Sequence, residues 1–324
     1  MELTGAQIVV NALKKAGVDT VFGYPGGQAL PLYDALYDSG IRHILTRHEQ
    51  GAVHAADGYA RATGKVGVCI STSGPGATNL ITGIATANMD SVPLVCITCQ
   101  VPRVMIGKDS FQEADIVGIT TPITKHNFLL RQVEQLPRVI AKAFHIAASG
   151  RPGPVVIDIP KNIQVEKTTH VEATEEELHM KGYRPLYAGR EEDVQAVVNA
   201  LRNAKKPLFF IGGGLVSGNM TDAFRHLAEK TGIPVVASLM GLSGYPTREK
   251  FHLGMPGMHG TYAANMAITE CDLLLGLGVR FDDRVTGEIK GFAPHAQIAH
   301  FDVDMSEINK NVHTPLRVPG DLAW

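Results

Sequence analysis

One acidic residue, Glu49, lies where a strand pattern ends and a helix pattern begins, in the segment TRHEQGAVHAADGYARATG. Ligands of parallel α/β proteins bind at the edge where strands end, so a carboxyl group there is a candidate for proton transfer. A simpler interpretation is that an acidic residue in the first turn of a helix offsets the helix dipole, an effect of about 0.3–1 kcal/mol. Taken alone, Glu49 favours the simpler interpretation.

A glycine-rich loop, STSGPGATNL at 71–80, joins a predicted buried strand to a predicted helix. Gly74 and Gly76 allow a tight turn and a close approach of the backbone to a ligand. Thr78 and Asn79 are predicted to cap the following helix. The loop lacks both the G-x-G-x-x-G spacing and the lysine of a phosphate-binding P-loop, so a phosphate cradle is weakly supported.

The turn GYPGG at 23–27, which contains Gly26 and Gly27, is a second glycine-rich loop. It carries even less information about a ligand than the first, because short glycine turns after strands are common. Each loop alone is interpreted as a turn.

The chain has four cysteines, too few for a disulfide framework in 324 residues. Cys96 and Cys99 have the spacing of a redox or metal-binding pair, but the segment VPLVCITCQ is typical of a buried strand and its exit. No second pair completes a zinc site. All four cysteines, Cys69, Cys96, Cys99 and Cys271, are therefore expected to be packing residues.

The first 160 residues alternate helix and strand patterns. Thr4 and Gln7 have the spacing of a capping box, which predicts a helix to Lys15 that Gly17 closes. Another helix is predicted from about Glu49 to Thr63. Strands separated by helices predict right-handed βαβ crossovers and a mostly parallel sheet covered on both faces. The predicted strands are 20–22, 43–46, 66–71, 92–98 and 154–160.

A polar, acidic stretch predicts a linker at 166–192, between a first domain at 1–165 and a second at 193–324. The second domain repeats the α/β pattern, with strands PLFFI, IPVVAS, DLLLGLG and QIAHFDV and a glycine run after PLFFI. The predicted fold class is α/β, with two doubly wound, mostly parallel sheets.

The composition excludes several functions. Acidic and basic residues nearly cancel, 32 against 30, and no basic cluster stands out, so nucleic acid and anionic membranes are poor candidate partners. The N-terminus lacks the order of a secretory signal, and no stretch approaches the roughly 20 apolar residues of a membrane span. We expect a cytoplasmic protein that acts on small molecules.

Five segments occur in one order over the first domain: RHEQGA, GYARATG, TSGPGATNL, GKDSFQE and SGRPGPVVIDIPKN. Together they resemble the pyrimidine-binding domain of thiamine-diphosphate enzymes, and specifically the acetolactate (acetohydroxyacid) synthase large subunit. The resemblance covers essentially the whole chain. It implies decarboxylation of pyruvate on thiamine diphosphate and transfer of the two-carbon unit to a second 2-keto acid, pyruvate or 2-ketobutyrate, in valine and isoleucine biosynthesis.

The resemblance also assigns roles to single residues. The glutamate matching Glu49 hydrogen-bonds N1′ of the cofactor's aminopyrimidine, where a carboxyl group can share a proton with the ring. The loop from Gly74 through Gly76 to Asn79 lies near the pyrimidine in that family. The match places Gln112 near the reaction site and the turn with Gly26 and Gly27 opposite the thiazolium.

Two stretches of the second domain, LGMPGMHGTYAANMA and GLGVRFDDRVTG, are similar to the central domain of the FAD-containing, biosynthetic branch of the family. The resemblance implies a structural FAD, since the carboligation moves no net electrons. The implied FAD residues are Arg151, Gly212, Gly213, Gly214, Ser238, Leu239, Met258, His259, Gly278, Arg280, Asp282, Val285, Asp302 and Asp321. Simpler interpretations remain open: a glycine turn at 212–214, a surface ion pair of Arg280 with Asp282, and a loop role for His259.

The sequence departs from the family in three ways. The family holds the diphosphate through Mg²⁺ bound by a later Gly-Asp-Gly segment, whereas Gly320 and Asp321 are followed by Leu322. The metal ligands and the C-terminal diphosphate-binding domain are therefore expected outside this sequence, and the chain is expected to be inactive alone, as a truncation or one part of a split enzyme. Cys99 and Lys108 also stand where the family has smaller residues, which puts the substrate preference in doubt.

Two alternative functions stay open: another thiamine-diphosphate carboligase or decarboxylase, and a non-catalytic flavin-binding module. The family implies a homodimer, and its biosynthetic branch implies a small regulatory subunit.

Overall fold

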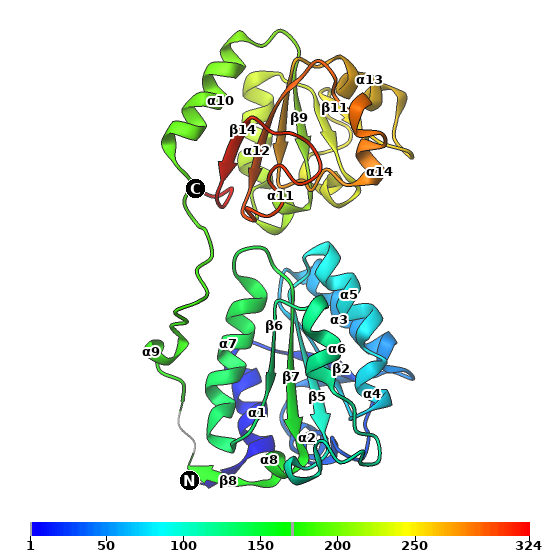
Figure 1. The fold of residues 1–324 in the computed structure, drawn as a ribbon, viewed down its shortest axis with the longest axis vertical. Coiled ribbons are helices and arrows are strands. Elements are labelled where there is room, and N and C mark those ends of the chain that lie inside the picture. Colours follow the sequence, from blue (N-terminus) through cyan, green and yellow to red (C-terminus); the bar gives the residue numbers. More distant parts are fainter. Residues whose placement is uncertain (1, 170–171) are drawn as a thin grey trace. The chain divides into compact units, whose positions relative to one another are not determined.

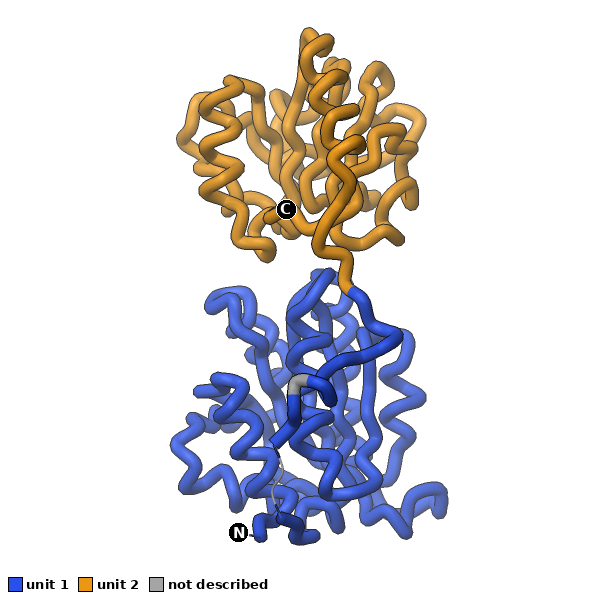
Figure 2. The backbone as a smooth tube through the Cα atoms, turned by 90° about the vertical axis from the view of Figure 1, so that its left-hand side faces the viewer, with its two compact units in different colours: residues 1–184 blue, residues 185–324 orange. Residues whose placement is uncertain are grey.

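The computed structural model describes residues 2–169 and 172–324. The chain divides into two compact units, Met1–Arg184 and Pro185–Trp324 (Figure 2). The division falls inside the predicted linker at 166–192, of which residues 170–171 lie outside the described part.

The first unit is built on a six-stranded sheet in which all neighbouring strands are parallel, in the order β3-β2-β4-β5-β7-β6 (Figure 1). The chain runs outward from β2 to β3 and then returns to the other side of β2 as β4, so the strand order reverses between β2 and β4. The strands are β2 Thr20–Gly23, β3 Arg42–Leu45, β4 Gly67–Ser71, β5 Leu94–Gln100, β6 His126–Leu129 and β7 Pro154–Pro160.

Helices cover both faces of this sheet. One buried cluster joins Ile8 and Leu32 to Ile70 of β4, and a second joins Val53 and Ile84 to Cys69 of the same strand. Because successive strand residues point to opposite faces, β4 contributes to both clusters. The helices are α1 Gly5–Lys15, α2 Leu30–Tyr37, α3 Glu49–Thr63, α4 Pro75–Thr78, α5 Ile81–Asp90, α6 Ile116–Thr120, α7 Leu136–Ala148, α8 Lys161–Val165 and α9 Glu175–Leu178.

The ends of α1 follow the local sequence. The Thr4 hydroxyl accepts a hydrogen bond from the Gln7 N–H and the Gln7 side-chain oxygen accepts one from the Thr4 N–H, which confirms the capping box. Gly17 has a φ of 77°, a left-handed conformation that favours glycine after a helix. The four cysteines are buried, as expected.

A short strand at the start of the chain has its partner at the far end of the first unit. β1 Glu2–Thr4 pairs antiparallel with β8 Lys167–Thr169, with Glu2 opposite Thr169. β8 and α9 both lie in the segment for which the sequence predicted only a linker. Alternation over three residues is too short to reveal such a pair.

The second unit has its own six-stranded parallel sheet, in the order β11-β10-β9-β12-β13-β14 (Figure 1). Helices again cover both faces, with Phe224 packed in the cluster on one face and Ile268 in the cluster on the other. The predicted fold class is confirmed for both units. The strands are β9 Pro207–Ile211, β10 Val235–Ala237, β11 His252–Gly254, β12 Leu273–Leu277, β13 Gln297–Asp302 and β14 Leu316–Pro319, and the helices are α10 Glu191–Asn203, α11 Gly213–Ser217, α12 Thr221–Thr231, α13 Tyr262–Glu270 and α14 Asp283–Thr286.

Among the described residues, no helix has the length and apolarity that a bilayer crossing requires.

Candidate functional site

The loops that follow β2, β3 and β4 meet at the carboxyl edge of the first sheet, where the strand order reverses. Such a reversal is the usual place for a ligand in a doubly wound sheet. A Cβ atom added to Gly26 would lie 2.5 Å from Cβ of Thr72, so the turn after β2 packs directly on the loop after β4. The Gln28 N–H donates to Thr72 Oγ1 at 3.2 Å and fixes this contact.

Glu49 is the first residue of α3, and it is only 7% exposed. Its Oε2 accepts a hydrogen bond from Asn79 Nδ2 at 2.9 Å. A Cβ atom on Gly76 would come within 3.2 Å of Oε1, so the glycine leaves that oxygen uncovered. Within the described part of the chain, no lysine or arginine forms an ion pair with Glu49. The arrangement provides a buried carboxyl group whose one hydrogen-bonding side chain is a neutral amide.

The predicted helix cap at Thr78 and Asn79 is wrong. The Thr78 hydroxyl donates to the Pro75 carbonyl, and the Asn79 amide turns to Glu49. The following helix, α5, begins at Ile81 without a side-chain cap. The local sequence does not reveal this partner of Asn79, because Glu49 lies in a different element, at the start of α3.

Gln112 is brought to the same edge by a tight loop at 107–113. Its φ is 58°, in the left-handed region, and a Cβ atom on Gly74 would lie 2.5 Å from its carbonyl oxygen. The Glu113 carboxylate holds this loop by accepting the N–H groups of Gly107, Lys108 and Ser110. These backbone hydrogen bonds, the one from Gly107 foremost, lower the pKa of Glu113.

Two buried hydroxyl groups near the end of β4 indicate which kind of ligand fits the candidate site. The hydroxyls of Ser71 and Ser73 are buried and have no hydrogen-bond partner among the residues that the structure places. Buried polar atoms are normally paired with protein, water or ligand. Unpaired hydroxyls beside a glycine-lined surface and a buried carboxyl group fit a polar heterocycle such as an aminopyrimidine.

Two side chains that hold the turn after β2 were not predicted from the sequence. Lys161 Nζ donates to the Gly27 carbonyl at 2.9 Å, and Gln164 Nε2 donates to the Gln28 carbonyl at 2.9 Å. Both come from α8, which follows the strand PVVIDIP. The sequence contained one indication that these two residues contribute to the site, namely that they follow the end of a predicted strand.

The residues predicted to bind FAD lie mostly at the carboxyl edge of the second sheet, where they are distributed over the ends of all six parallel strands. The loop after β9 and the loop after β12 contact each other through their backbones. The Gly214 N–H donates to the Gly278 carbonyl at 3.1 Å, and a Cβ atom on Gly278 would lie 2.6 Å from Gly214 Cα. Those at this edge are Gly212, Gly213 and Gly214 after β9, Ser238 and Leu239 after β10, Met258 and His259 after β11, Gly278, Arg280, Asp282 and Val285 after β12, Asp302 ending β13 and Asp321 after β14.

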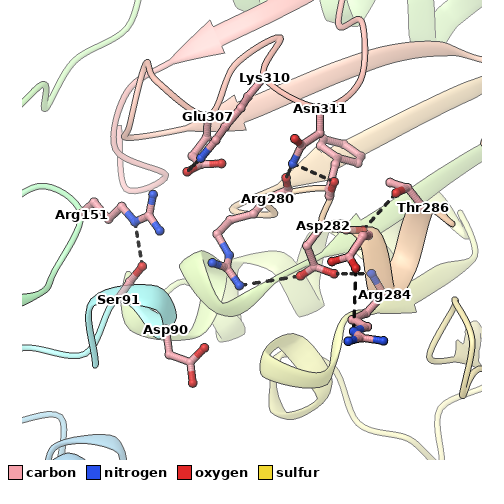
Figure 3. A network of polar contacts seen from close by, with 12 residues as sticks. Asp90, Ser91, Arg151, Arg280, Asp282, Arg284, Thr286, Glu307, Lys310 and Asn311 are labelled. Carbon is pink, nitrogen blue, oxygen red and sulfur yellow. Dashed lines mark hydrogen bonds and ion pairs between the residues drawn. The ribbon is translucent and has the colours of Figure 1, made fainter. Parts of the chain in front are cut away.

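Three of these predictions have a local partner (Figure 3). Arg280 and Asp282 form an ion pair at 3.7 Å, and both side chains are partly exposed. The structure therefore contains the surface ion pair that the sequence offered as the alternative to FAD binding. Arg151 belongs to the first unit, where its Nε donates to Ser91 Oγ at 2.8 Å. His259 and Met258 are exposed.

Known proteins match both units. Residues 3–119 match the family described as "Thiamine pyrophosphate enzyme, N-terminal TPP binding domain", and residues 194–323 match "Thiamine pyrophosphate enzyme, central domain". The chain belongs to the thiamine pyrophosphate enzymes. The resemblance found in the sequence motifs is thereby confirmed at the level of the family, whose cofactor is thiamine diphosphate.

Curated relatives of this thiamine pyrophosphate enzyme are similar over nearly the whole chain. The acetolactate synthase of Mycobacterium bovis is 53% identical over 322 residues, which are 99% of this chain and 52% of the relative. The acetolactate synthase isozyme 2 large subunit of Escherichia coli is 50% identical over 327 residues, 99% of this chain and 57% of the relative. The acetolactate synthase large subunit of Corynebacterium glutamicum is 50% identical over 320 residues, 98% and 51%. The chain spans about half the length of these relatives.

Proposed function

We propose that this chain supplies the pyrimidine-binding part of an acetolactate synthase. The complete enzyme would decarboxylate pyruvate and join the two-carbon unit to pyruvate or 2-ketobutyrate, a step of branched-chain amino-acid biosynthesis. The observation that carries the proposal is the buried Glu49 carboxyl group, oriented by Asn79 beside Gly76. The names of the relatives support the choice of reaction.

The residues of this site would bind, orient and move a proton. Glu49 would share a proton with the ring nitrogen of the pyrimidine, because no lysine or arginine among the described residues forms an ion pair with its carboxyl group. Asn79 would keep the carboxyl group in one rotamer. Gly26, Gly74 and Gly76 would let the backbone approach the cofactor closely. Bound thiamine diphosphate would supply a nucleophilic carbon and an electron sink.

Gln112 would lie on the substrate side of the site, because its backbone packs on Gly74. Gly27, whose carbonyl accepts from Lys161, would face the thiazolium. The diphosphate and its Mg²⁺ would be held by the part of the enzyme that the relatives have beyond this match.

The experiment that tests the proposal combines the chain with the separately produced remainder of the Escherichia coli relative. Acetolactate formation from pyruvate should appear on mixing with thiamine diphosphate and Mg²⁺, and Glu49→Gln should reduce it by at least about a hundredfold, the usual effect of losing acid–base catalysis. Carboligation with a different acceptor would favour another thiamine-diphosphate enzyme. Full activity of Glu49→Gln at matched circular dichroism would disprove the role of Glu49.

We also propose that the second domain, predicted at 193–324, binds FAD as a structural group. A parallel sheet whose strands all end in loops at one edge, with a Gly214–Gly278 backbone contact where the order reverses, is suited to a dinucleotide. The aspartates there would accept ribose hydroxyl groups and the arginines would contact the pyrophosphate. A colourless chain whose melting temperature does not respond to added FAD would contradict this part, and FAD binding without carboligation in the mixing experiment would favour the flavin-binding module.

A homodimer, a small regulatory subunit and a cytoplasmic location complete the proposal. Sedimentation of the chain alone and with the small subunit of a relative tests the first two.

A further inference from the structure

A buried carboxyl group, Asp158, lies in the middle of the first unit and has no part in the proton transfer proposed above. It sits on β7 directly opposite Thr98 of β5 and is 2% exposed. The Thr98 hydroxyl donates to Asp158 Oδ1 at 2.7 Å. No lysine or arginine pairs with it in the part of the chain that the structure describes, so its hydrogen bonds must offset the cost of burial.

The second oxygen of Asp158 is tied to Gln100, the last residue of β5. Gln100 Nε2 donates both to Asp158 Oδ2 at 3.0 Å and to the Ala114 carbonyl at 2.9 Å. Gln100 Oε1 accepts the N–H of Val101 at 2.9 Å. Every polar atom of this 3%-exposed side chain is therefore used, and its orientation is fixed.

The hydrogen bond to the Ala114 carbonyl connects these strand residues to a segment outside the sheet. Ala114 follows Gln112 by two residues, in the stretch that closes the 107–113 loop. Gln112 in turn packs its backbone on Gly74, beside the loop that carries Asn79. A continuous path of contacts thus runs from Asp158 through Gln100 to the loop at the candidate site.

We propose that Asp158 is a positioning residue, which holds the 107–114 loop, and with it Gln112, against the glycine loop at 71–80 by fixing the side chain of Gln100. The value of this positioning for turnover rests on the proposed function. The structural claim, that a buried carboxyl group holds a surface loop in place, does not depend on the proposed function.

The choice of a carboxylate at this position has a physical reason. Hydrogen bonds to an ionised acceptor are about twice as strong as those between neutral groups, so an ionised Asp158 restrains Gln100 more firmly than a neutral side chain would. A role confined to joining β5 and β7 would need only the Thr98 contact, because the two strands already pair along their length. The hydrogen bond from Gln100 is the one that connects Asp158 to the loop, because the same Gln100 amide also donates to the Ala114 carbonyl.

The test is hydrogen exchange measured by mass spectrometry on the full chain at neutral pH. Asp158→Ala should speed exchange of the peptides covering 107–114 about tenfold or more, relative to peptides from β4 and β5 in the same sample. Gln100→Leu should give the same acceleration, and the two together should add little to either, because they act in series.

Two variants separate positioning from a general loss of stability. Asp158→Asn should speed loop exchange by only about threefold, less than Asp158→Ala, since its neutral oxygen can still accept from Gln100, though more weakly than a carboxylate, while its amide donates to a reversed Thr98 hydroxyl. Thr98→Val removes the other hydrogen bond of Asp158 and leaves the path to Ala114 intact, so the loop should again stay within about threefold of wild type.

Unchanged loop exchange in Asp158→Ala, or equal acceleration in Thr98→Val, would overturn the proposal. If Asp158→Ala does not fold, Gln100→Leu against Thr98→Val decides the same question. Because exchange is read on the chain alone, its outcome is independent of whether Glu49 proves to act in carboligation.

Discussion

Asn79 Nδ2 donates a hydrogen bond to Glu49 Oε2 at 2.9 Å and so joins the loop after β4 to the start of α3. The bond occupies one carboxyl oxygen and leaves the other, Oε1, facing the position where Gly76 has no side chain. The two oxygens thus have different surroundings, one structural and one open to a ligand.

Removing the amide at position 79 should disorder the carboxyl group. Asn79→Ala leaves Glu49 without its side-chain donor, so we expect acetolactate formation in the mixed enzyme to fall about tenfold, as for a lost hydrogen bond to an ionisable group. The neighbouring Thr78→Ala is the control, because the Thr78 hydroxyl bonds only the Pro75 carbonyl, and its rate should stay within about twofold. Equal rates for both variants would contradict the orienting role.

Adding one methyl group at Gly76 should block the site. Its Cβ atom would lie 2.7 Å from Thr72 Cγ2 and 3.2 Å from Glu49 Oε1, so Gly76→Ala must displace one of them. We expect thiamine diphosphate binding, measured by calorimetry on the mixed enzyme, to weaken at least tenfold. Gly58→Ala in the same fold unit is the matched control: that glycine lies in α3 with nothing within 4 Å, and the change should stabilise the helix by roughly 1 kcal/mol without affecting binding.

The stability of the first unit should depend on pH through Asp158. Burial, opposed by the hydrogen bonds from Thr98 and Gln100 and reinforced by Asp115, raises the pKa of Asp158 from 3.8 to about 6. The folded state therefore binds this proton more tightly than the unfolded state, so the contribution is present below about pH 4 and is lost as the pH rises through about 6.

Asp158→Asn removes this titration. In urea titrations followed by circular dichroism, the free energy of unfolding of wild type relative to Asp158→Asn should fall by about 2 kcal/mol between pH 4 and pH 6, out of a total of about 3 kcal/mol, and should level off above about pH 7. A difference that does not change over this range would show that the carboxyl group titrates normally.

The glycine contact of the second unit should tolerate no side chain. Gly278 has a φ of 59° and its added Cβ atom would lie 2.6 Å from Gly214 Cα, so Gly278→Ala should lower the stability of this unit by roughly 2 kcal/mol or more and weaken FAD retention. Gly291→Ala, at a glycine with nothing within 4 Å, should change neither. The absorbance of retained flavin and the fluorescence transition of Trp324 are the two measurements.

The long elements could be predicted from sequence because their patterns are local. The predicted helix from Glu49 to Thr63 matches α3, and the predicted strand 154–160 matches β7. Apolar runs between glycine and proline residues define such buried strands well. The strand β6 was missed because HNFL is short and only partly buried.

The site could be predicted only in part. Motif order pointed to Glu49, Gly76 and Gln112, and the structure gathers them at one edge of the sheet. The partners of these residues lie on other elements of the fold: Asn79 for Glu49, Lys161 for Gly27, and Asp158 with Gln100 for the loop at 107–114. Such pairings depend on strand order and register, which cannot be predicted from the pattern of neighbouring residues in the sequence.

The pairing of Glu2 with Thr169 has a consequence for synthesis on the ribosome. The residues of β1 must wait for their strand partner until nearly the whole first unit has been translated, and α1, which follows β1, also packs on α7 and α8 from the end of that unit. Because closing so long a loop is slow compared with forming helices, the amphipathic α1 stays without its partners during elongation. A nascent chain arrested before residue 169 should therefore hold trigger-factor-type chaperones at β1 and α1, and release them once that residue clears the exit tunnel.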